Sequence, residues 1–265
     1  MNMEITLSNP HGASSPKTVA KKLRPKVRFM HPTDLTSQKD AMWALVQPLI
    51  ACDRAEWYAM FDRTALYAIY ELEAQIIGFS SVMEAELAVE GRLIWTIGLG
   101  QTVILPAHRN QFLVQKALIF RWIRHFLRHP LQPIYIWGSC VSYKSYLSFA
   151  KVLRVVYPMQ GVVTPAKQKH VIDALGQHWY AAEYDPTAGV VVQQDFAVAD
   201  PYALPRPEDL LDADIAYYFA TVPKLVGATA GLLTISPCTR SNFLPMVWGW
   251  VRNTVRKGLG PRRKK

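Results

Sequence analysis

Three β-rich runs followed by one long amphipathic segment constrain the fold of this chain more than any other feature. The runs cover residues 65–73, 74–88 and 93–106. The short turn around Glu73 and Ala74 predicts an antiparallel hairpin between the first two runs. In the third run, Gly98 and Gly100 indicate a bulge or a close approach by another backbone. A sheet therefore precedes the amphipathic segment.

The segment 109–128 has helical periodicity, with an apolar face and a cationic face. The apolar face holds Leu113, Phe120, Ile123, Phe126 and Leu127, and the cationic face holds Arg121, Arg124, His125 and Arg128. A buried strand is expected at 132–140, because its core is apolar without alternation. A helix is then expected over 142–153, capped by Ser139 or Ser142. This order predicts an α/β fold with a mixed, mostly antiparallel sheet flanked by helices.

The rest of the chain gives weaker signals. Residues 37–62 predict helices, with Thr36 or Ser37 as the N-cap and Pro48 dividing the run. Later elements are expected as helices at 165–181 and 209–222, a strand at 228–235 and an amphipathic tail at 243–257. The predicted organisation is a flexible basic arm (1–27), a core (28–160), a C-terminal extension (161–250) that completes the acceptor and acyl site, and a basic tail (251–265).

Cysteine and histidine usage argues against several kinds of site. The three cysteines, Cys52, Cys140 and Cys238, are far apart and lack zinc-site spacing. His170 and His178 also lack ligand spacing, so no metal is expected. The polar N-terminus lacks the apolar block of a secretory signal, and no apolar run is long enough to span a membrane. The sequence therefore predicts a cytoplasmic protein, with peripheral membrane contact left open.

The formal net charge of +10 is concentrated at the two ends of the chain. Such tails are often only solvated, but they can also attract an acidic partner. An anionic membrane surface, an acidic carrier protein and a nucleic acid are the candidates, with nucleic acid the least favoured. The aromatic and basic segment 243–265 suits an anionic membrane, an acidic carrier protein, or packing of its tryptophans in the interior equally well.

The junction between the third run and the long helix reads "LPAHRNQFLV" over residues 105–114. Pro106 and Arg109 stand where helix amides still lack partners, and such an end can hold an anion. Together with the order of elements, this junction resembles the GNAT superfamily of acyl-CoA-dependent N-acyltransferases over roughly residues 30–160. Phe112 and Val114 depart from that family's pattern, which has small residues at these positions.

The resemblance implies a set of residues that would hold the pantetheine and pyrophosphate of the acyl donor. In this sequence they are Val103, Ile104, Leu105, His108, Arg109, Asn110, Gln111, Phe112, Leu113 and Val114, joined by Ser142, Ser145 and Phe149 in the following helix. The implied donor is an acyl-CoA, or an acyl-carrier protein with its phosphopantetheine arm. The bulky Phe112 and Val114 leave the choice between these donors open.

The family's departing thiolate often takes its proton from a tyrosine in the helix after the last core strand. Phe149 occupies that position here and cannot donate a proton. Tyr146, and after it Tyr143, is the nearest phenol that could act as the acid, since 146 shares part of the face of 149. An ordinary packing role for these tyrosines is the alternative.

N-acyl transfer also needs a base for the amine. Glu84 and Glu86 point to the same face of their strand and are the candidate bases, although exposed charges at a strand end would look the same. Gln101 lies near the family's usual position but cannot act as a base. His108 could relay a proton.

The expected reaction is transfer of an acyl group from the thioester to an amine. Apolar residues around the proposed site, and the segment 224–237, favour a fatty or otherwise bulky acyl group. This version resembles the GNAT enzymes that acylate ornithine or lysine side chains of natural-product peptides, or small amines. A short-chain N-acetyltransferase and an inactive, GNAT-like protein that binds nucleic acid or membranes are the alternatives.

Overall fold

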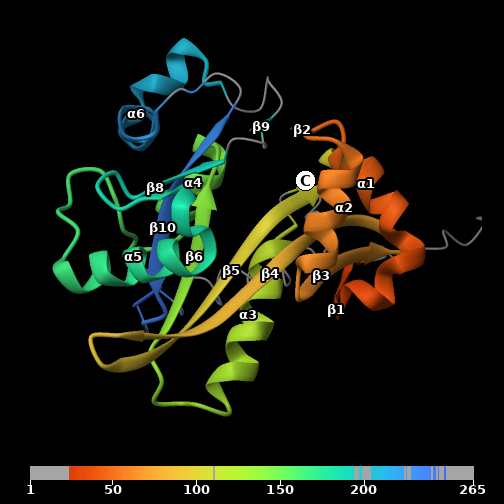
Figure 1. The fold of residues 1–265 in the computed structure, drawn as a ribbon, viewed down its shortest axis with the longest axis horizontal. Coiled ribbons are helices and arrows are strands. Elements are labelled where there is room, and N and C mark those ends of the chain that lie inside the picture. Colours follow the sequence, from red (N-terminus) through yellow and green to blue (C-terminus); the bar gives the residue numbers. More distant parts are fainter. Residues whose placement is uncertain are drawn as a thin grey trace, which may run out of the picture.

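The computed structural model describes residues 24–109, 111–193, 197–198, 204–223, 225, 228–239, 241–242, 244 and 248. Its centre is an eight-stranded sheet with the strand order β1-β3-β4-β5-β6-β10-β8-β7 (Figure 1). Every neighbouring pair in this sheet is antiparallel except β5 and β6, which are parallel. The predicted mixed, mostly antiparallel sheet is therefore confirmed.

The bounds of the elements are as follows. The main sheet comprises β1 (Lys26–Met30), β3 (Leu66–Leu72), β4 (Gln75–Val89), β5 (Arg92–Ile104), β6 (Ile134–Cys140), β7 (Tyr184–Asp185), β8 (Val190–Gln193) and β10 (Thr229–Pro237), while β2 (Ile50–Ala51) pairs with β9 (Ala197–Val198) in a small second sheet. The helices are α1 (Lys39–Val46), α2 (Arg54–Arg63), α3 (Leu113–Phe126), α4 (Tyr143–Ala150), α5 (Ala166–Tyr180) and α6 (Ala213–Thr221). Short 3-10 helices cover Pro32–Gln38, Pro106–His108, Ala181–Glu183 and Pro207–Leu211.

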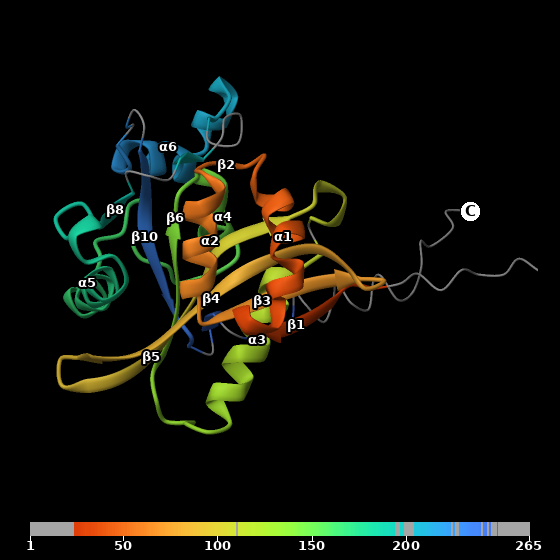
Figure 2. The same ribbon diagram turned by 45° about the vertical axis from the view of Figure 1, so that its right-hand side comes forward.

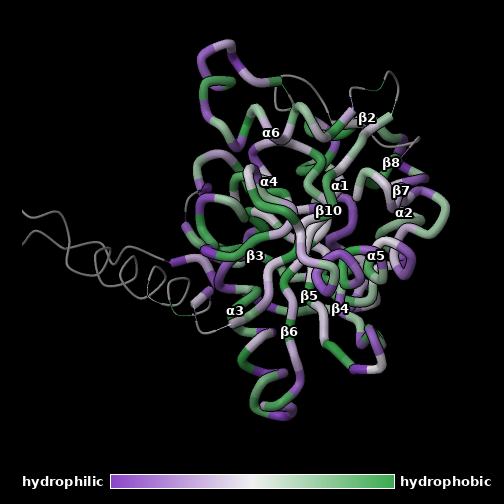
Figure 3. The backbone as a smooth tube through the Cα atoms, turned by 90° about the vertical axis from the view of Figure 1, so that its left-hand side faces the viewer, coloured by the Kyte–Doolittle hydropathy of each residue, from purple (hydrophilic) through white to green (hydrophobic). Residues whose placement is uncertain are grey.

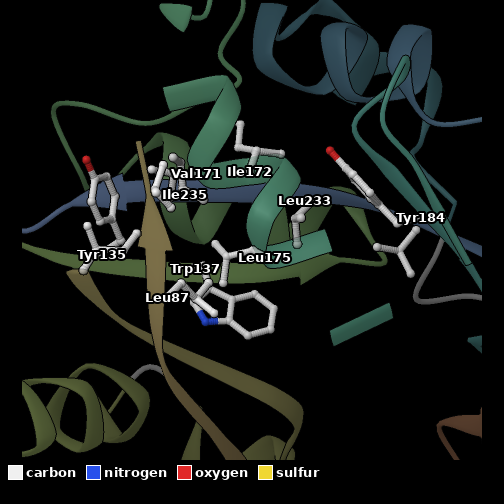
Figure 4. Packing of buried hydrophobic residues seen from close by; sticks show 12 residues of the cluster. Leu87, Tyr135, Trp137, Val171, Ile172, Leu175, Tyr184, Leu233 and Ile235 are labelled. Carbon is white, nitrogen blue, oxygen red and sulfur yellow. The ribbon is translucent and has the colours of Figure 1, made fainter. Parts of the chain in front are cut away.

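Helices cover both faces of the main sheet (Figure 2). Helices α1 and α2 pack over β3 and β4, and α5 packs over β4, β6 and β10, on what we call the α5 face. Figure 4 shows the α5 cluster, in which Trp137, Leu175 and Leu233 meet. The other face, which we call the α3 face, carries α3 against β3–β6 and α4 with α6 against β10.

Several predicted elements are found, with shifted ends. The turn at Glu73 and Ala74 has positive φ at both residues (53° and 64°), as a tight hairpin requires. Ser142 caps α4, as predicted, because its hydroxyl accepts a bond from the Ser145 amide. The predicted N-cap of α1 at Thr36 or Ser37 is wrong, since a 3-10 helix runs through Gln38 and α1 begins at Lys39.

The C-terminal extension belongs to the same sheet as the core. Strand β10 pairs with β6 along Leu232–Pro237, and β8 pairs with β10 in turn. Leu232, Leu233 and Ile235 of the segment predicted to line an acyl site are fully buried between the helices of both faces. They form core rather than a lining. Of the predicted tail at 243–257, only 244 and 248 lie within the described residues.

Candidate active site

The one parallel pair of the main sheet separates part-way along its length. Strands β5 and β6 pair over four positions, from Trp95 with Ile134 to Gly98 with Trp137. Beyond this point β5 continues to Ile104 and pairs only with β4, while β6 continues to Cys140 and pairs only with β10. Each strand therefore has a backbone edge without a strand partner in the described chain. We call this opening the β5–β6 fork.

A bulge shapes β5 beside the fork. Phe79 pairs with Val103 and Ser81 pairs with Gly100, so β5 has one residue more than β4 in this interval. Gln101 has a φ of 24°, which locates the irregular backbone. A bulge bends its strand and turns backbone groups away from the ladder. The bulge that Gly98 and Gly100 led us to expect is confirmed.

Buried hydroxyl groups fix the bulge from the α3 face. The Ser80 hydroxyl lies 2.8 Å from the Tyr70 phenol oxygen and 2.9 Å from the Thr102 hydroxyl. The Thr102 hydroxyl also donates to the carbonyl of Gly100, at 3.1 Å. Ser80 and Tyr70 are fully buried, so this chain of bonds holds β5 in its irregular path.

Helix α3 begins where β5 ends and starts abruptly at a left-handed residue. Its N-cap, Phe112, has φ 60° and ψ 27° and makes no side-chain capping bond. The Lys116 amide is bonded to the Phe112 carbonyl, as the first bond of the helix. The N-cap side chain therefore does not bond to the amides of the first turn, and such an end favours an anion. The helix starts four residues later than expected, because Phe112 departs from helical dihedral angles.

The predicted donor-binding residues surround this junction. The Leu105 amide donates to the Ile77 carbonyl at 2.9 Å, which fixes the end of β5 against β4. The exposed Arg109 donates through Nε to the Ile104 carbonyl at 3.1 Å. Gln111 lies 3.5 Å from Nδ1 of His108. The predicted Asn110 lies outside the described residues.

The apolar members of the predicted set pack beside the fork, on different faces. Val103 joins the α1–α2 core on the α5 face. Ile104, Leu113 and Val114 join the cluster between α3 and the sheet. Val114 therefore packs with residues of the α3 face of the sheet.

Helix α4 lies on the same side of the sheet as α3. Its predicted donor-binding residues Ser142 and Ser145 bond to each other in a capping box, with backbone-to-hydroxyl distances of 3.3 and 3.2 Å. The Phe149 ring packs at 3.3 Å from the position that a Cβ on Gly138 would take. Phe149 therefore covers β6 just after Trp137, the last residue of β6 that pairs with β5.

Tyr146 is completely buried on the other side of α4. It packs with Cys140, Tyr218 and β10. Its phenol makes no hydrogen bond of ordinary geometry within the described chain. Burial raises the pKa of this phenol above its usual value, and the backbone of Gln160 lowers it by less. The phenol is therefore protonated at neutral pH and is an unused donor.

Glu84 and Glu86 lie away from the fork and are already engaged. Their register partners on β5 are Ile97 and Trp95, in the part where β5 and β6 still pair. Glu84 forms a bidentate ion pair with Arg121 of α3, and both side chains are largely buried. Glu86 accepts a bond of 2.9 Å from the Gln132 side chain. Both carboxylates thus attach α3 and its following loop to the sheet, and this arrangement does not favour them as bases.

Sequence reasoning missed Trp137, which stands at the point where the fork begins. Its indole lies flat against Gly98, where a Cβ would meet ring atoms at 2.6 to 2.9 Å. The side chain is buried, yet its Nε1–H has no hydrogen-bond partner within the described residues. Trp179 and Tyr180 of α5 pack against it. Because Gly98 precedes Trp137 by 39 positions, no local sequence pattern indicates that the two residues contact each other.

The described residues contain no cluster of histidine, cysteine or carboxylate side chains that could hold a metal ion. A phosphorylated thioester donor fits the residues better. The fork offers unpaired strand edges, α3 offers a first turn to which the N-cap side chain makes no bond, and Tyr146 offers a buried phenol on the same face of the sheet as α3. These are the groups that a pantetheine arm with a pyrophosphate would engage.

Comparisons with known proteins add a distant likeness. No protein-family model matches the sequence, and no curated protein matches it. A ribosomal-protein-alanine N-acetyltransferase from Brucella melitensis is 14% identical, with 54% of this chain and 100% of that chain covered and a TM-score of 0.38. An aminoglycoside acetyltransferase from an uncultured soil metagenomic sample is 13% identical (54% and 99% covered, TM-score 0.37), and a Trypanosoma brucei acetyltransferase is 18% identical (54% and 100%, TM-score 0.33). At these scores the likeness decides nothing, so the function is argued from this chain's own residues.

Proposed function

We propose that this protein is an N-acyltransferase of the GNAT type, which transfers an acyl group from a coenzyme A thioester to an amine. The observation that carries the proposal is the β5–β6 fork, because a single parallel strand pair separates beside a bulge and directly before a helix whose N-cap makes no side-chain bond. An extended pantetheine arm can hydrogen-bond to the free edge of a strand, as an added strand would. The pyrophosphate then reaches the first turn of α3.

Each part of the donor has a candidate partner. Arg109 lies at the end of β5, where a guanidinium adds charge-assisted bonds to phosphate oxygens. The bulge over Gly100–Val103 lies beside the fork, and one amide there would polarise the thioester carbonyl. The proposed pyrophosphate site is the first turn of α3, and this helix packs on the α3 face of the sheet. We therefore assign the donor to the α3 face and the amine to the α5 face.

The reaction follows from this arrangement. The lone pair of a neutral amine attacks the carbonyl carbon, and the carbonyl oxygen becomes an oxyanion held by the bulge amide. When the intermediate collapses, the carbon–sulfur bond breaks and the amide product forms. The amine nitrogen loses a proton, and the departing thiolate gains one.

Tyr146 is our candidate for the proton donor to sulfur. The last paired residues of β5 and β6 are Gly98 and Trp137. Three residues further along, β5 reaches Gln101 at the bulge and β6 reaches Cys140, and Tyr146 packs against Cys140. Its phenol is protonated and donates no hydrogen bond of ordinary geometry within the described chain, and both properties suit a general acid. Glu84 and Glu86 take no part in this scheme, because both serve the attachment of α3.

The nature of the acyl group and acceptor is a finer part of the proposal. Phe149 in place of a polar donor, and Phe112 and Val114 in place of small residues, give the surroundings of the fork an apolar character that supports a bulky or fatty acyl group. A peptide side chain such as ornithine or lysine, or a small amine, would be the acceptor. The carrier-protein donor and a role of the basic termini in binding a carrier protein or anionic membrane remain part of this proposal.

A thiol-release assay tests the proposal directly. The full-length protein is incubated with acetyl, octanoyl and palmitoyl thioesters of coenzyme A and with a panel of amines and lysine-containing peptides, while free thiol and acylated product are followed by mass spectrometry. We expect amine-dependent thiol release with the longer donors. Release with acetyl donor alone would replace the bulky-acyl version with a short-chain acetyltransferase. No release with any donor, together with salt-sensitive retention on heparin, would support the inactive binding protein instead.

Two arginines on β5 and its continuation provide a matched pair of variants. Arg109→Ala should weaken donor binding about tenfold, which corresponds to roughly 1.4 kcal/mol. Arg92→Ala removes an exposed arginine at the opposite end of β5 and should leave donor affinity unchanged. Equal affinities of the two variants would remove Arg109 from the donor site.

A further inference from the structure

The outward face of α3 is apolar, although a helix on a sheet usually presents polar residues to solvent. Phe120, Ile123 and Leu127 follow one another at helical spacing on this face, with exposures of 39%, 38% and 75%. Another side of the helix faces the sheet: Leu113 and Ala117 are buried there, Arg121 pairs with Glu84 of β4, and His125 stacks on Trp95 of β5. The stripe is therefore only partly covered by the described chain.

The stripe continues past the end of the helix. Leu131, in the loop between α3 and β6, is 89% exposed. Figure 3 shows hydrophobic segments in this loop, at the lower edge of the molecule. Leu93 of β5 is 59% exposed and lies two positions before Trp95, whose ring stacks on His125 of α3 at 4.0 Å. We call Phe120, Ile123, Leu127, Leu131 and Leu93 the α3 apolar surface.

Positive charge borders this surface. Arg124 and Arg128 are exposed and occupy the last turn of α3 and the residues after it. The ammonium of Lys116 lies 5.6 Å from the centre of the Phe120 ring. The sequence contains no Asp or Glu between Gly91 and Ile172, an interval that holds both α3 and its loop. The carboxylates that contact α3 and its loop, Glu84 and Glu86, come from β4 and are bonded to Arg121 and Gln132.

We propose that the α3 apolar surface binds the headgroup region of an anionic lipid bilayer. Exposed leucine and phenylalanine side chains bordered by arginine and lysine are the pattern of a helix that lies in a membrane interface. The cations attract anionic headgroups, and the apolar side chains gain free energy by leaving water. A nucleic acid would satisfy the cations but would leave the leucines exposed. None of the described helices is long and apolar enough to cross a membrane, so the contact is peripheral.

Vesicle flotation tests this proposal with the full-length protein. Vesicles of phosphatidylcholine alone are compared with vesicles that also contain phosphatidylglycerol. We expect binding to the anionic vesicles and little binding to the neutral ones. The variant Leu127→Glu with Leu131→Glu should lose affinity about tenfold or more, because two exposed apolar side chains no longer enter the interface. Both positions are largely exposed, so folding should be retained, which circular dichroism checks.

Three further variants separate the sources of binding. Val163→Glu with Leu211→Glu alters two apolar residues elsewhere that are at least about as exposed (91% and 88%) and should bind as the unmodified protein does. Arg124→Gln with Arg128→Gln should weaken binding to anionic vesicles only. Replacement of the final four basic residues by serine tests the C-terminal tail. The proposal is overturned if the unmodified protein does not bind to anionic vesicles. It is also overturned if the tail variant loses binding while the variant with Leu127→Glu and Leu131→Glu keeps it.

Discussion

The left-handed conformation of Phe112 predicts an unusual order of stabilities. A residue with a Cβ at φ 60° has a backbone cost of about 1–2 kcal/mol, which glycine avoids. Phe112→Ala keeps this cost and loses the half-buried ring, a loss of about 1 kcal/mol. Phe112→Gly also loses the ring, but it no longer has the backbone cost of positive φ. Against this gain, the greater freedom of glycine in the unfolded chain lowers stability by roughly 0.5–1 kcal/mol.

Phe112→Gly should therefore be more stable than Phe112→Ala by about 0.5–1 kcal/mol, whereas alanine is the more stable residue at most other positions. Urea unfolding of the three proteins measures this order. Both variants also remove the phenyl ring from the start of α3, so titration calorimetry should show tighter binding of coenzyme A to both. A glycine variant less stable than the alanine variant would refute a left-handed Phe112, and with it the abrupt start of α3.

Three other predictions concern the ion pair, the buried phenol and the buried Cys140 thiol. Glu84→Gln leaves Arg121 without its carboxylate, so the free energy of unfolding should fall by about 2 kcal/mol. The variant should keep most of its kcat. A loss of activity without a loss of stability would restore Glu84 as a candidate base. Tyr146→Phe removes a hydroxyl that makes no hydrogen bond of ordinary geometry within the described chain, so stability measured in urea should change little. The kcat should drop about a hundredfold if the phenol protonates the thiolate, and an unchanged kcat would assign Tyr146 to packing alone. Burial raises the pKa of the Cys140 thiol to about 12, so the unfolded chain loses this proton first as the pH passes about 9. Stability should therefore fall from about pH 9 toward pH 12, and a urea midpoint that stays constant over this range would contradict the burial of this thiol.

The sheet before α3 could be predicted from the sequence because its signals are local. The hairpin at Glu73 and Ala74 and the bulge near Gly100 both leave a mark within a few residues. The capping box of α4 is local as well, since Ser142 and Ser145 are three positions apart. Strands β7 and β8 are short, and β8 is only four residues long, so they leave no periodicity to detect.

The parts of the candidate site that were missed depend on residues far apart in the sequence. Glu84 and Arg121 are separated by 37 positions, and only the packing of α3 on β4 shows that the carboxylate is already paired. The contact of Trp137 with Gly98 likewise needs the parallel register of β5 and β6. The start of α3 was set too early because a positive φ at phenylalanine has no sequence signal.

Hydrogen–deuterium exchange with a donor analogue tests the central claim most directly, namely that the β5–β6 fork and the start of α3 hold the thioester. The full-length protein is compared with and without a non-reactive thioether analogue of an acyl-CoA. The account predicts slower exchange over 99–104 of β5 and over the first turn of α3 at 113–116, with no change in β3 over 66–72, where the ladder is already complete on both sides. Binding of the analogue with protection elsewhere, or no binding at all, would contradict it.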